Sequence, residues 1–278
     1  MKKSRIGSKI YIALCMIFLY APILVLIVFS FNESKSRAYF TGFTFKWYRQ
    51  LLENDLIMTS LFNSLLIALL ASVISAVVGT AAAVGISKFG KRARGVIMNV
   101  TYLPVLNPEI VTGISMMLLF VFFKNLFGFK MGFATVLIAH ITFNLPYIIL
   151  NVMPKLSQMD PDLTEAALDL GCTPVQAFFK VIIHEIMPGI LSGALMAFTM
   201  SLDDFVISYF VYGPSFVTLP VEIYNYTKKP LQPKIYALFT LLFLAILLVM
   251  VVMNLVQAGD ERRRRQARGV FGKKGASA

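Results

Sequence analysis

Six stretches of mostly apolar side chains, each about as long as a membrane-spanning helix, constrain the fold of this chain more than any other feature. Crossing the hydrocarbon core of a bilayer as a helix takes about 20 such residues. The sequence therefore predicts an all-α membrane protein with about six transmembrane helices. The predicted spans comprise residues 10–31, 61–86, 96–123, 133–153, 181–211 and 236–256.

The composition supports one membrane domain over residues 1–278. Hydrophobic residues make up 58% of the 278 residues and charged residues only 14%, a balance that would leave a soluble protein covered in apolar surface. The first span follows basic residues as a signal peptide does, but its apolar run exceeds the about 7–15 residues of a signal core. Cys15 and Cys172 are the only cysteines, so we expect two free thiols and neither a disulfide framework nor a metal site.

The basic residues indicate the orientation of the chain. The net charge of +12 lies in short segments between apolar stretches, which is typical of topology signals and not of nucleic-acid binding. With a cytoplasmic N-terminus, 17 of the 26 lysines and arginines lie on the cytoplasmic side, including those of the basic tail 258–278. The positive-inside rule therefore predicts that both termini are cytoplasmic. The run at 262–265 is read as a stop-transfer anchor, with contact to anionic membrane lipid as the alternative.

Small residues recur at every fourth position of the second span. Such a face lets another helix approach closely, either within this chain or from a second subunit. The two stripes are Ala68, Ser72, Ala76 and Thr80, and Ala71, Ser75, Gly79 and Ala83.

The loop 158–180 between the fourth and fifth spans carries the signals of two short helices. Asp160 is suited to cap the first helix, Pro161 to begin it, and Gly171 to close it in a left-handed conformation. Thr173 and Pro174 repeat the start signal and lead into the fifth span. We expect a small helical projection on the cytoplasmic side, suited to contact with an external motor, although a plain connector has the same signals.

A near match to a phosphate-binding loop lies at residues 85–92. The residue after Lys91 is Arg92 and not the hydroxyl residue that holds magnesium, and the segment follows a membrane helix instead of a strand. We interpret it as a basic cytoplasmic turn, so the chain has no nucleotide site of its own.

The same loop carries a family motif. Glu165, Ala166 and Ala167, followed by Gly171 and then Val181, resemble the EAA loop of binding-protein-dependent ABC importers. In that family the loop forms the coupling helix, which docks in a cleft of the ATPase subunit. The Leu-Pro that ends the family pattern is replaced by Ile183 and His184, so the resemblance covers the docking residues but not the bend that follows them.

A second set of residues narrows the resemblance. Ser201, Asp203, Asp204 and then Gly213, Pro214 and Ser215 look like the PotC type of permease from spermidine/putrescine importers. The resemblance implies a multi-pass protein of a prokaryotic cytoplasmic membrane. It also implies three kinds of partner: a pair of ATPase subunits that hold ATP and magnesium, a homologous second permease, and an extracytoplasmic polyamine-binding protein. No cofactor is expected in this chain.

Three carboxylates, Glu109, Asp203 and Asp204, lie inside predicted spans. Each costs about 2.5–3.5 kcal/mol at the centre of a membrane helix, so we expect them to face water or a partner group instead of lipid. A solute with several ammonium groups would supply the countercharge, and the break at Asn107 and Pro108 would widen its path. Burial against neighbouring helices is the alternative. Adjacent residues point about 100° apart on a helix, so we expect only one of the two aspartates to face the path.

The predicted solute path comprises Glu109, Ser201, Asp203 and Asp204, with Trp47 as an aromatic contact for an ammonium group. Anchoring at the membrane interface is the alternative for Trp47. Tyr224 and Tyr226 have the same two possible roles, with a weaker signal. His140, among apolar residues, is expected to be buried and hydrogen-bonded.

The function predicted from these features is that of a permease subunit that imports polyamines with energy from a separate ATPase. An importer of another small solute, such as ferric iron, an oxyanion or a vitamin, is the alternative within the family, and the carboxylates disfavour an oxyanion. A self-contained cation channel or exchanger would have no use for an ATPase-docking loop. An enzyme is disfavoured because the sequence contains no nucleophile–base pair and only two histidines.

Overall fold

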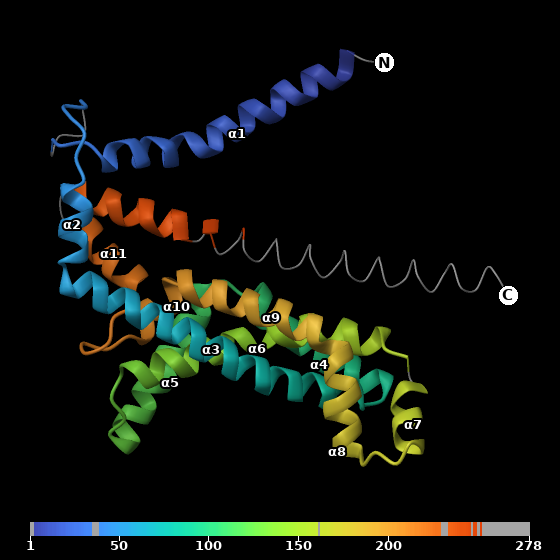
Figure 1. Cartoon of the computed structure of the whole chain (residues 1–278). Helices are drawn as coiled ribbons and strands as arrows, with labels where there is room; N and C mark the ends of the chain where they lie inside the picture. Colours follow the sequence, from blue (N-terminus) through green and yellow to red (C-terminus); the bar gives the residue numbers. More distant parts are fainter. Residues whose placement is uncertain are drawn as a thin grey trace. The chain divides into compact units, whose positions relative to one another are not determined.

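The computed structural model describes residues 3–34, 39–160, 162–228, 233–245, 247–248 and 251. Its regular elements within these residues are helices (Figure 1), and two isolated bridges join Asn32 to Phe43 and Gly213 to Phe216. The sequence suggested a single membrane domain, whereas the contacts divide the chain into two compact units. One consists of residues 1–54 and 229–278, and the other of residues 55–228.

The first unit contains α1 (Lys3–Ser30), α2 (Lys46–Leu52) and the helix Pro233–Ala245. The apolar window of α1 is not buried anywhere by the rest of the chain, so its side chains are available to lipid or to another subunit. The predicted span 236–256 lies partly outside the described residues, and the basic tail 258–278 lies wholly outside them.

The second unit is centred on three long helices, α3 (Asp55–Ser87), α6 (Phe133–Gln158) and α9 (Ile183–Asp203). The small residues of α3 face this centre: both stripes are buried except Ala76, which is partly buried. They pack against apolar residues of α6 and α9, among them Ile148, Val152 and Ile186. The stripes therefore serve packing within this chain.

The predicted span 96–123 differs from the structure in its bounds and is interrupted at the break that the sequence indicated. The chain forms α4 (Lys91–Leu106) and α5 (Glu109–Phe127), separated at Asn107 and Pro108. Pro108 lacks a backbone N–H and disfavours a helical conformation of the preceding residue. Asn107 is extended accordingly, with ψ of 142°.

The predicted span 181–211 is wrong as one continuous helix. The helical run begins earlier, at α8 (Pro174–Ala177), passes through a π-helical turn, η1 (Phe178–Ile182), and continues as α9 to Asp203. Asp204 is extended, with ψ of 117°, and α10 (Val206–Val211) follows. The sequence also did not predict the two short helices α2 and α11 (Leu219–Thr227).

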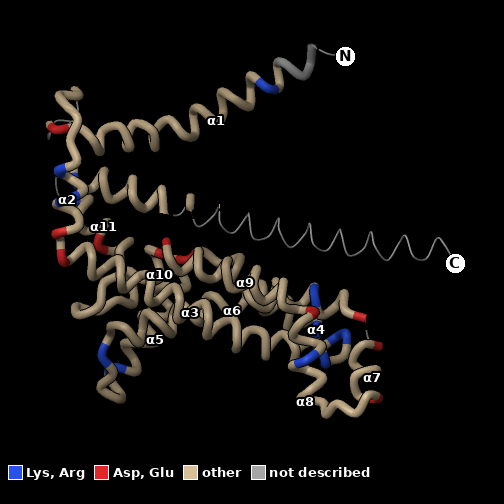
Figure 2. The backbone as a smooth tube through the Cα atoms, in the orientation of Figure 1, with Lys and Arg blue, Asp and Glu red and all other residues tan. Residues whose placement is uncertain are grey.

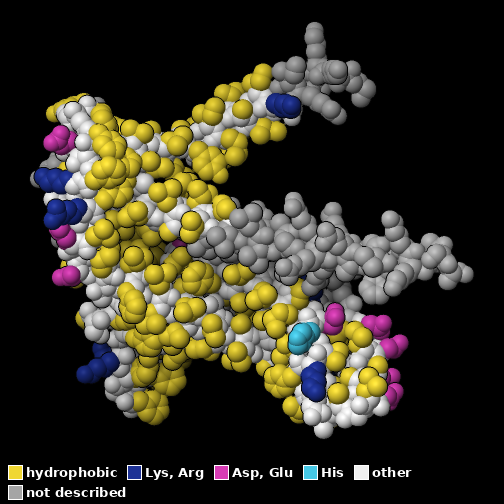
Figure 3. Space-filling view, in the orientation of Figure 1, with side chains coloured by type: hydrophobic (Ala, Val, Ile, Leu, Met, Phe, Trp, Pro, Cys, Tyr) yellow, Lys and Arg dark blue, Asp and Glu magenta, His cyan; other side chains and the backbone are white. Residues whose placement is uncertain are grey.

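Five helices in the described part of the chain are long and apolar enough to cross a membrane. Within the second unit, lysine and arginine residues gather where α3 ends and α4 begins, near α7 (Asp162–Asp169), and again around the end of α5 (Figure 2). Apolar side chains cover the surface between these two regions (Figure 3). This distribution matches a bundle that presents apolar side chains to lipid and charges to the two aqueous sides.

Candidate functional site

The loop after α6 folds as the two short helices that the sequence predicts. An Asp160 carboxylate oxygen accepts the Asp162 backbone N–H at 3.1 Å, at the start of α7. Gly171 is left-handed, with φ of +83°, and the Cys172 N–H then donates to the Ala167 carbonyl at 3.1 Å. Thr173 begins α8 with a capping box, in which Thr173 and Gln176 exchange side-chain and backbone hydrogen bonds. Pro161 lies outside the described residues.

Side chains of this loop leave a mixed acidic and apolar surface. Glu165 and Ala166 are exposed, whereas Ala167 is buried and packs inward. Beside them Leu170, Val175 and Phe179 are exposed by 85%, 65% and 59%. Apolar side chains exposed together in this way are typical of a surface that contacts another protein or lipid.

The helix that leaves the loop is continuous from Pro174 to Asp203 for 30 residues. The π-helical turn Phe178–Ile182 immediately precedes Ile183 and His184, the two residues that depart from the family pattern. Pro188 lies further on, inside α9. The loop is therefore joined by one helix to the middle of the bundle.

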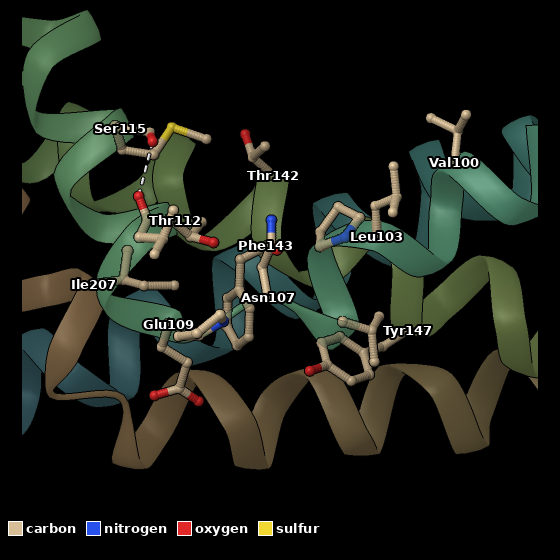
Figure 4. A pocket seen from close by; sticks show the side chains of 15 residues that line it. Val100, Leu103, Asn107, Glu109, Thr112, Ser115, Thr142, Phe143, Tyr147 and Ile207 are labelled. Atoms are coloured by element: carbon tan, nitrogen blue, oxygen red, sulfur yellow. Dashed lines mark hydrogen bonds between the residues drawn. The ribbon is translucent and has the colours of Figure 1, made fainter.

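A cavity of about 580 Å³ lies in the second unit between α4, α5, α6 and α10 (Figure 4). Its wall is mostly apolar, with Asn107, Glu109, Thr112 and Tyr147 among its polar side chains. Asn107 and Pro108, at the helix break, line it directly. The break thus opens space beside the first residue of α5.

Two helix breaks bring the three carboxylates together. Glu109 is the first residue of α5 and Asp203 is the last residue of α9. Glu109 lies close enough to Asp203 and Asp204 to be repelled by both, and it also interacts electrostatically with the Tyr147 hydroxyl. Within the described residues, no lysine or arginine forms an ion pair with Glu109 or Asp203. The negative charge beside the cavity is therefore available to a cation.

The two aspartates have different surroundings. Asp203 is exposed, whereas Asp204 is only 8% exposed and accepts hydrogen bonds from the backbone N–H groups of Ile207 and Ser208. The prediction that both lie on one continuous helix is wrong, because the helix ends at Asp203 and the extended Asp204 sets its own direction.

Ser201 and His140 are held inside the bundle. Ser201 is buried, and its hydroxyl accepts a hydrogen bond from the Asn144 side chain at 2.8 Å. His140 has no exposed surface, and its Nε2 lies 3.0 Å from the Ser208 hydroxyl, as expected for a buried, hydrogen-bonded side chain. Ser201 therefore lies near the acidic residues in the sequence, but its side chain is buried and not exposed as those of Glu109 and Asp203 are.

Trp47 lies in the first unit, on α2, with 5% of its surface exposed. Its indole N–H donates to the Asn32 carbonyl at 2.7 Å. This bond and the burial give the side chain a structural role within its own unit, and the ring is closed to a solute in this structure.

The sequence did not predict an aromatic cluster that joins α10 to α11. The rings of Phe205, Tyr209 and Tyr224 lie 4.8–5.5 Å apart, and the Lys228 ammonium lies 4.6 Å from the Tyr224 ring centre. The helical spacing of four between Phe205 and Tyr209, and between Tyr224 and Lys228, is the signal that would have indicated it. The Lys228 ammonium thus lies in the position of a cation–π contact with the Tyr224 ring.

Known proteins share this architecture and sequence. Residues 75–266 match the family described as binding-protein-dependent transport system inner membrane component. The chain belongs to this family. It is accordingly a multi-pass permease subunit of the inner membrane, as the motif at Glu165 implied.

Two curated relatives extend over most of this permease. The putrescine transport system permease protein PotI of Escherichia coli K12 is 39% identical over 251 residues, which cover 89% of each chain. The spermidine/putrescine transport system permease protein PotC of the same strain is 36% identical over 246 residues, 88% of this chain and 91% of that protein.

A solved structure supports the fold. The crystal structure of a bacterial ABC transporter involved in the import of the acidic polysaccharide alginate superposes with a TM-score of 0.71, at 15% identity. The match covers 91% of this chain and 94% of the other. The all-α permease fold predicted from the apolar stretches is thereby confirmed.

Proposed function

We propose that this permease moves spermidine or putrescine inward across the membrane, driven by ATP hydrolysis in a separate pair of ATPase subunits. The observation that carries the proposal is that Glu109 lines a cavity of about 580 Å³ at one helix break and lies within electrostatic reach of Asp203 at the other. Two carboxylates without a basic partner among the described residues suit a solute that carries several ammonium groups. The names of PotI and PotC support the same solute class.

Glu109 and Asp203 are assigned to bind ammonium groups of the passing solute. Both are exposed in the isolated chain, and a charge at this depth is too costly to face lipid. A homologous second permease would supply the rest of the path, and an extracytoplasmic polyamine-binding protein would deliver the solute.

The coupling loop is assigned to dock the ATPase. Glu165 and Ala166 would contact a cleft of that subunit together with the exposed Leu170, while Ala167 and Gly171 shape the helix that presents them. With this loop in the cytoplasm, the basic residues near α4 lie on the same side, and the positive-inside rule assigns both termini to the cytoplasm as well.

The test is uptake of radiolabelled spermidine and putrescine by cells that express the complete system at matched membrane levels. Glu109→Gln and Asp203→Asn are expected to reduce uptake at least about tenfold, because each removes one charge-assisted contact. Glu53→Gln is the matched control, since its exposed carboxylate pairs with Arg49 at the surface.

A separate variant, Glu165→Arg, tests the proposed docking of the ATPase. Glu165→Arg is expected to abolish both uptake and co-purification of the ATPase, whereas Asp203→Asn leaves co-purification intact. Wild-type cells that take up neither polyamine would refute the proposed solute. A Glu165→Arg variant that still binds the ATPase and transports normally would refute the proposed dock.

A further inference from the structure

The break between α9 and α10 is held by a buried polar cluster that the solute path does not use. The cluster consists of Asp204 at the break, His140 on α6, and Ser208 on α10. The exposed fractions of Asp204, His140 and Ser208 are 8%, 0% and 0%. These side chains therefore contact one another instead of the cavity.

The Asp204 carboxylate holds the first turn of α10. One oxygen accepts the Ile207 N–H at 3.2 Å, and the other accepts the Ser208 N–H at 2.8 Å. These two N–H groups have no partner inside the short helix, so the carboxylate satisfies donors that burial would otherwise leave unpaired.

His140 connects this turn to α6. Its Nε2 lies 3.0 Å from the Ser208 hydroxyl and 3.4 Å from an Asp204 carboxylate oxygen. Among the described residues its Nδ1 has no hydrogen-bond partner. We assign the proton to Nε2, because a donor there faces two acceptors and a bare acceptor at Nδ1 costs less than an unpaired donor.

The far end of α10 is fastened to the same helix. The Thr135 hydroxyl of α6 lies 2.7 Å from the Val211 carbonyl oxygen, at the last residue of α10. Between these two points Ile207 lines the cavity, and Phe210 packs against Gly113 of α5. The short helix α10 is thus joined to α6 at both ends and forms part of the cavity wall.

The other side of the break leads to the coupling loop. The continuous helix from Pro174 to Asp203 spans 30 residues, about 45 Å at 1.5 Å per residue. It reaches from the surface that we assign to the ATPase to the residue next to Asp204. This helix therefore connects the loop to the break. At the break the backbone is extended, so α10 is not rigidly coupled to α9.

We propose that Asp204, His140 and Ser208 form a latch that keeps α10 docked on α6 as the bundle rearranges during the ATP cycle. In this arrangement α10 and the part of the cavity wall that it forms move together with α6. Asp204 is accordingly a positioning residue and Asp203 the solute contact. The inference rests on the proposed ATP-driven transport but not on the identity of the solute.

The experiment uses the complete complex in nanodiscs and four variants. His140→Leu removes the Nε2 donor, and His140→Gln is its matched control because the glutamine amide places an N–H near the same point. Asp204→Asn removes the charge, and the double variant His140→Leu with Asp204→Asn tests whether the two residues act together.

Two quantities are measured for each variant. Hydrogen exchange of the segment 204–212 reports the Ile207 and Ser208 amide groups directly, and it needs no solute. Transport per ATP hydrolysed, with polyamine and binding protein supplied, reports coupling. A merely structural role would lower the amount of assembled complex and speed exchange of this segment, but it would leave transport per ATP unchanged in the complexes that assemble.

The latch predicts about tenfold faster exchange of this segment and a several-fold loss of transport per ATP in His140→Leu, with His140→Gln close to wild type. The double variant should be no worse than Asp204→Asn alone. Unchanged exchange or unchanged transport per ATP in His140→Leu would overturn the latch, as would a loss of uptake on Asp204→Asn that His140→Leu does not share. If Asp204→Asn does not assemble, the comparison of His140→Leu with His140→Gln gives the result. A wild type that moves no polyamine refutes the solute, and unchanged exchange in His140→Leu would then still overturn the latch.

Discussion

Gly79 of α3 packs directly against Ile148 of α6: a Cβ atom at position 79 would lie 2.7 Å from the Ile148 Cβ. This distance is too short for two carbon atoms, so any side chain at 79 forces the two helices apart. Both residues lie at the packed centre of the second unit. The approach of α3 to α6 therefore depends on the absence of a side chain at this point.

Gly79→Val is expected to destabilise the protein by about 1–3 kcal/mol, the usual effect of overpacking a core. The measurement is the midpoint of thermal unfolding of the purified protein in detergent. Gly85→Val is the control on the same helix, because a Cβ at position 85 meets no atom within 4 Å. Equal shifts of the two midpoints would show that α3 and α6 tolerate separation here.

Gly171 follows α7, which we propose docks the ATPase, and has a positive φ of 83°, a conformation that costs other residues about 1–2 kcal/mol. Gly171→Val is therefore expected to loosen the loop and to lower the ATPase activity stimulated by the binding protein severalfold. Gly171→Asn should retain most of that activity, since asparagine adopts left-handed conformations more easily than β-branched residues. Similar activities of the two variants would mean that the docked loop does not need this backbone conformation.

Substitution of Glu109 tests whether uptake depends on the charge of the solute. Spermidine carries three ammonium groups at neutral pH and putrescine two, so a path with fewer carboxylates should impair the more highly charged solute more. Glu109→Gln is thus expected to reduce spermidine uptake by a larger factor than putrescine uptake, measured in parallel on the same cells. The isosteric change leaves the cavity shape intact, so an equal reduction for both polyamines would indicate an effect on assembly or coupling instead.

The helical membrane fold and the coupling loop were predictable because their signals are local. Length and hydropathy identify a membrane helix without reference to any other segment, and Asp160, Gly171 and Thr173 each act within one or two turns of their own position. The same reasoning indicated the break at Pro108, since a proline acts on the residue immediately before it.

The burial of Asp204 beside His140 was not predictable, because it depends on a residue that lies 64 positions earlier in the sequence. The end of the helix at Asp203 has a local signal that the sequence analysis missed: aspartate caps helices, and the Asp204 carboxylate accepts the N–H groups of Ile207 and Ser208, three and four positions on. Likewise the sequence showed Trp47 among other aromatic residues at a segment boundary, but not the Asn32 carbonyl that takes its N–H. Contacts between residues distant in sequence determine the surroundings of both Asp204 and Trp47.

Two substitutions of Trp47 distinguish a structural role of this side chain from direct contact with the solute. Trp47→Phe keeps an aromatic face but loses the N–H donated to Asn32, so it should lower stability by about 1 kcal/mol with little change in uptake. Trp47→Ala removes the whole buried ring and should cost about 3–5 kcal/mol, reducing the amount of assembled permease. Uptake normalised to the assembled complex should then be nearly the same for both variants and wild type. If normalised uptake instead falls in Trp47→Ala and is restored in Trp47→Phe, the ring face itself contacts the solute, and the first unit contributes to the path.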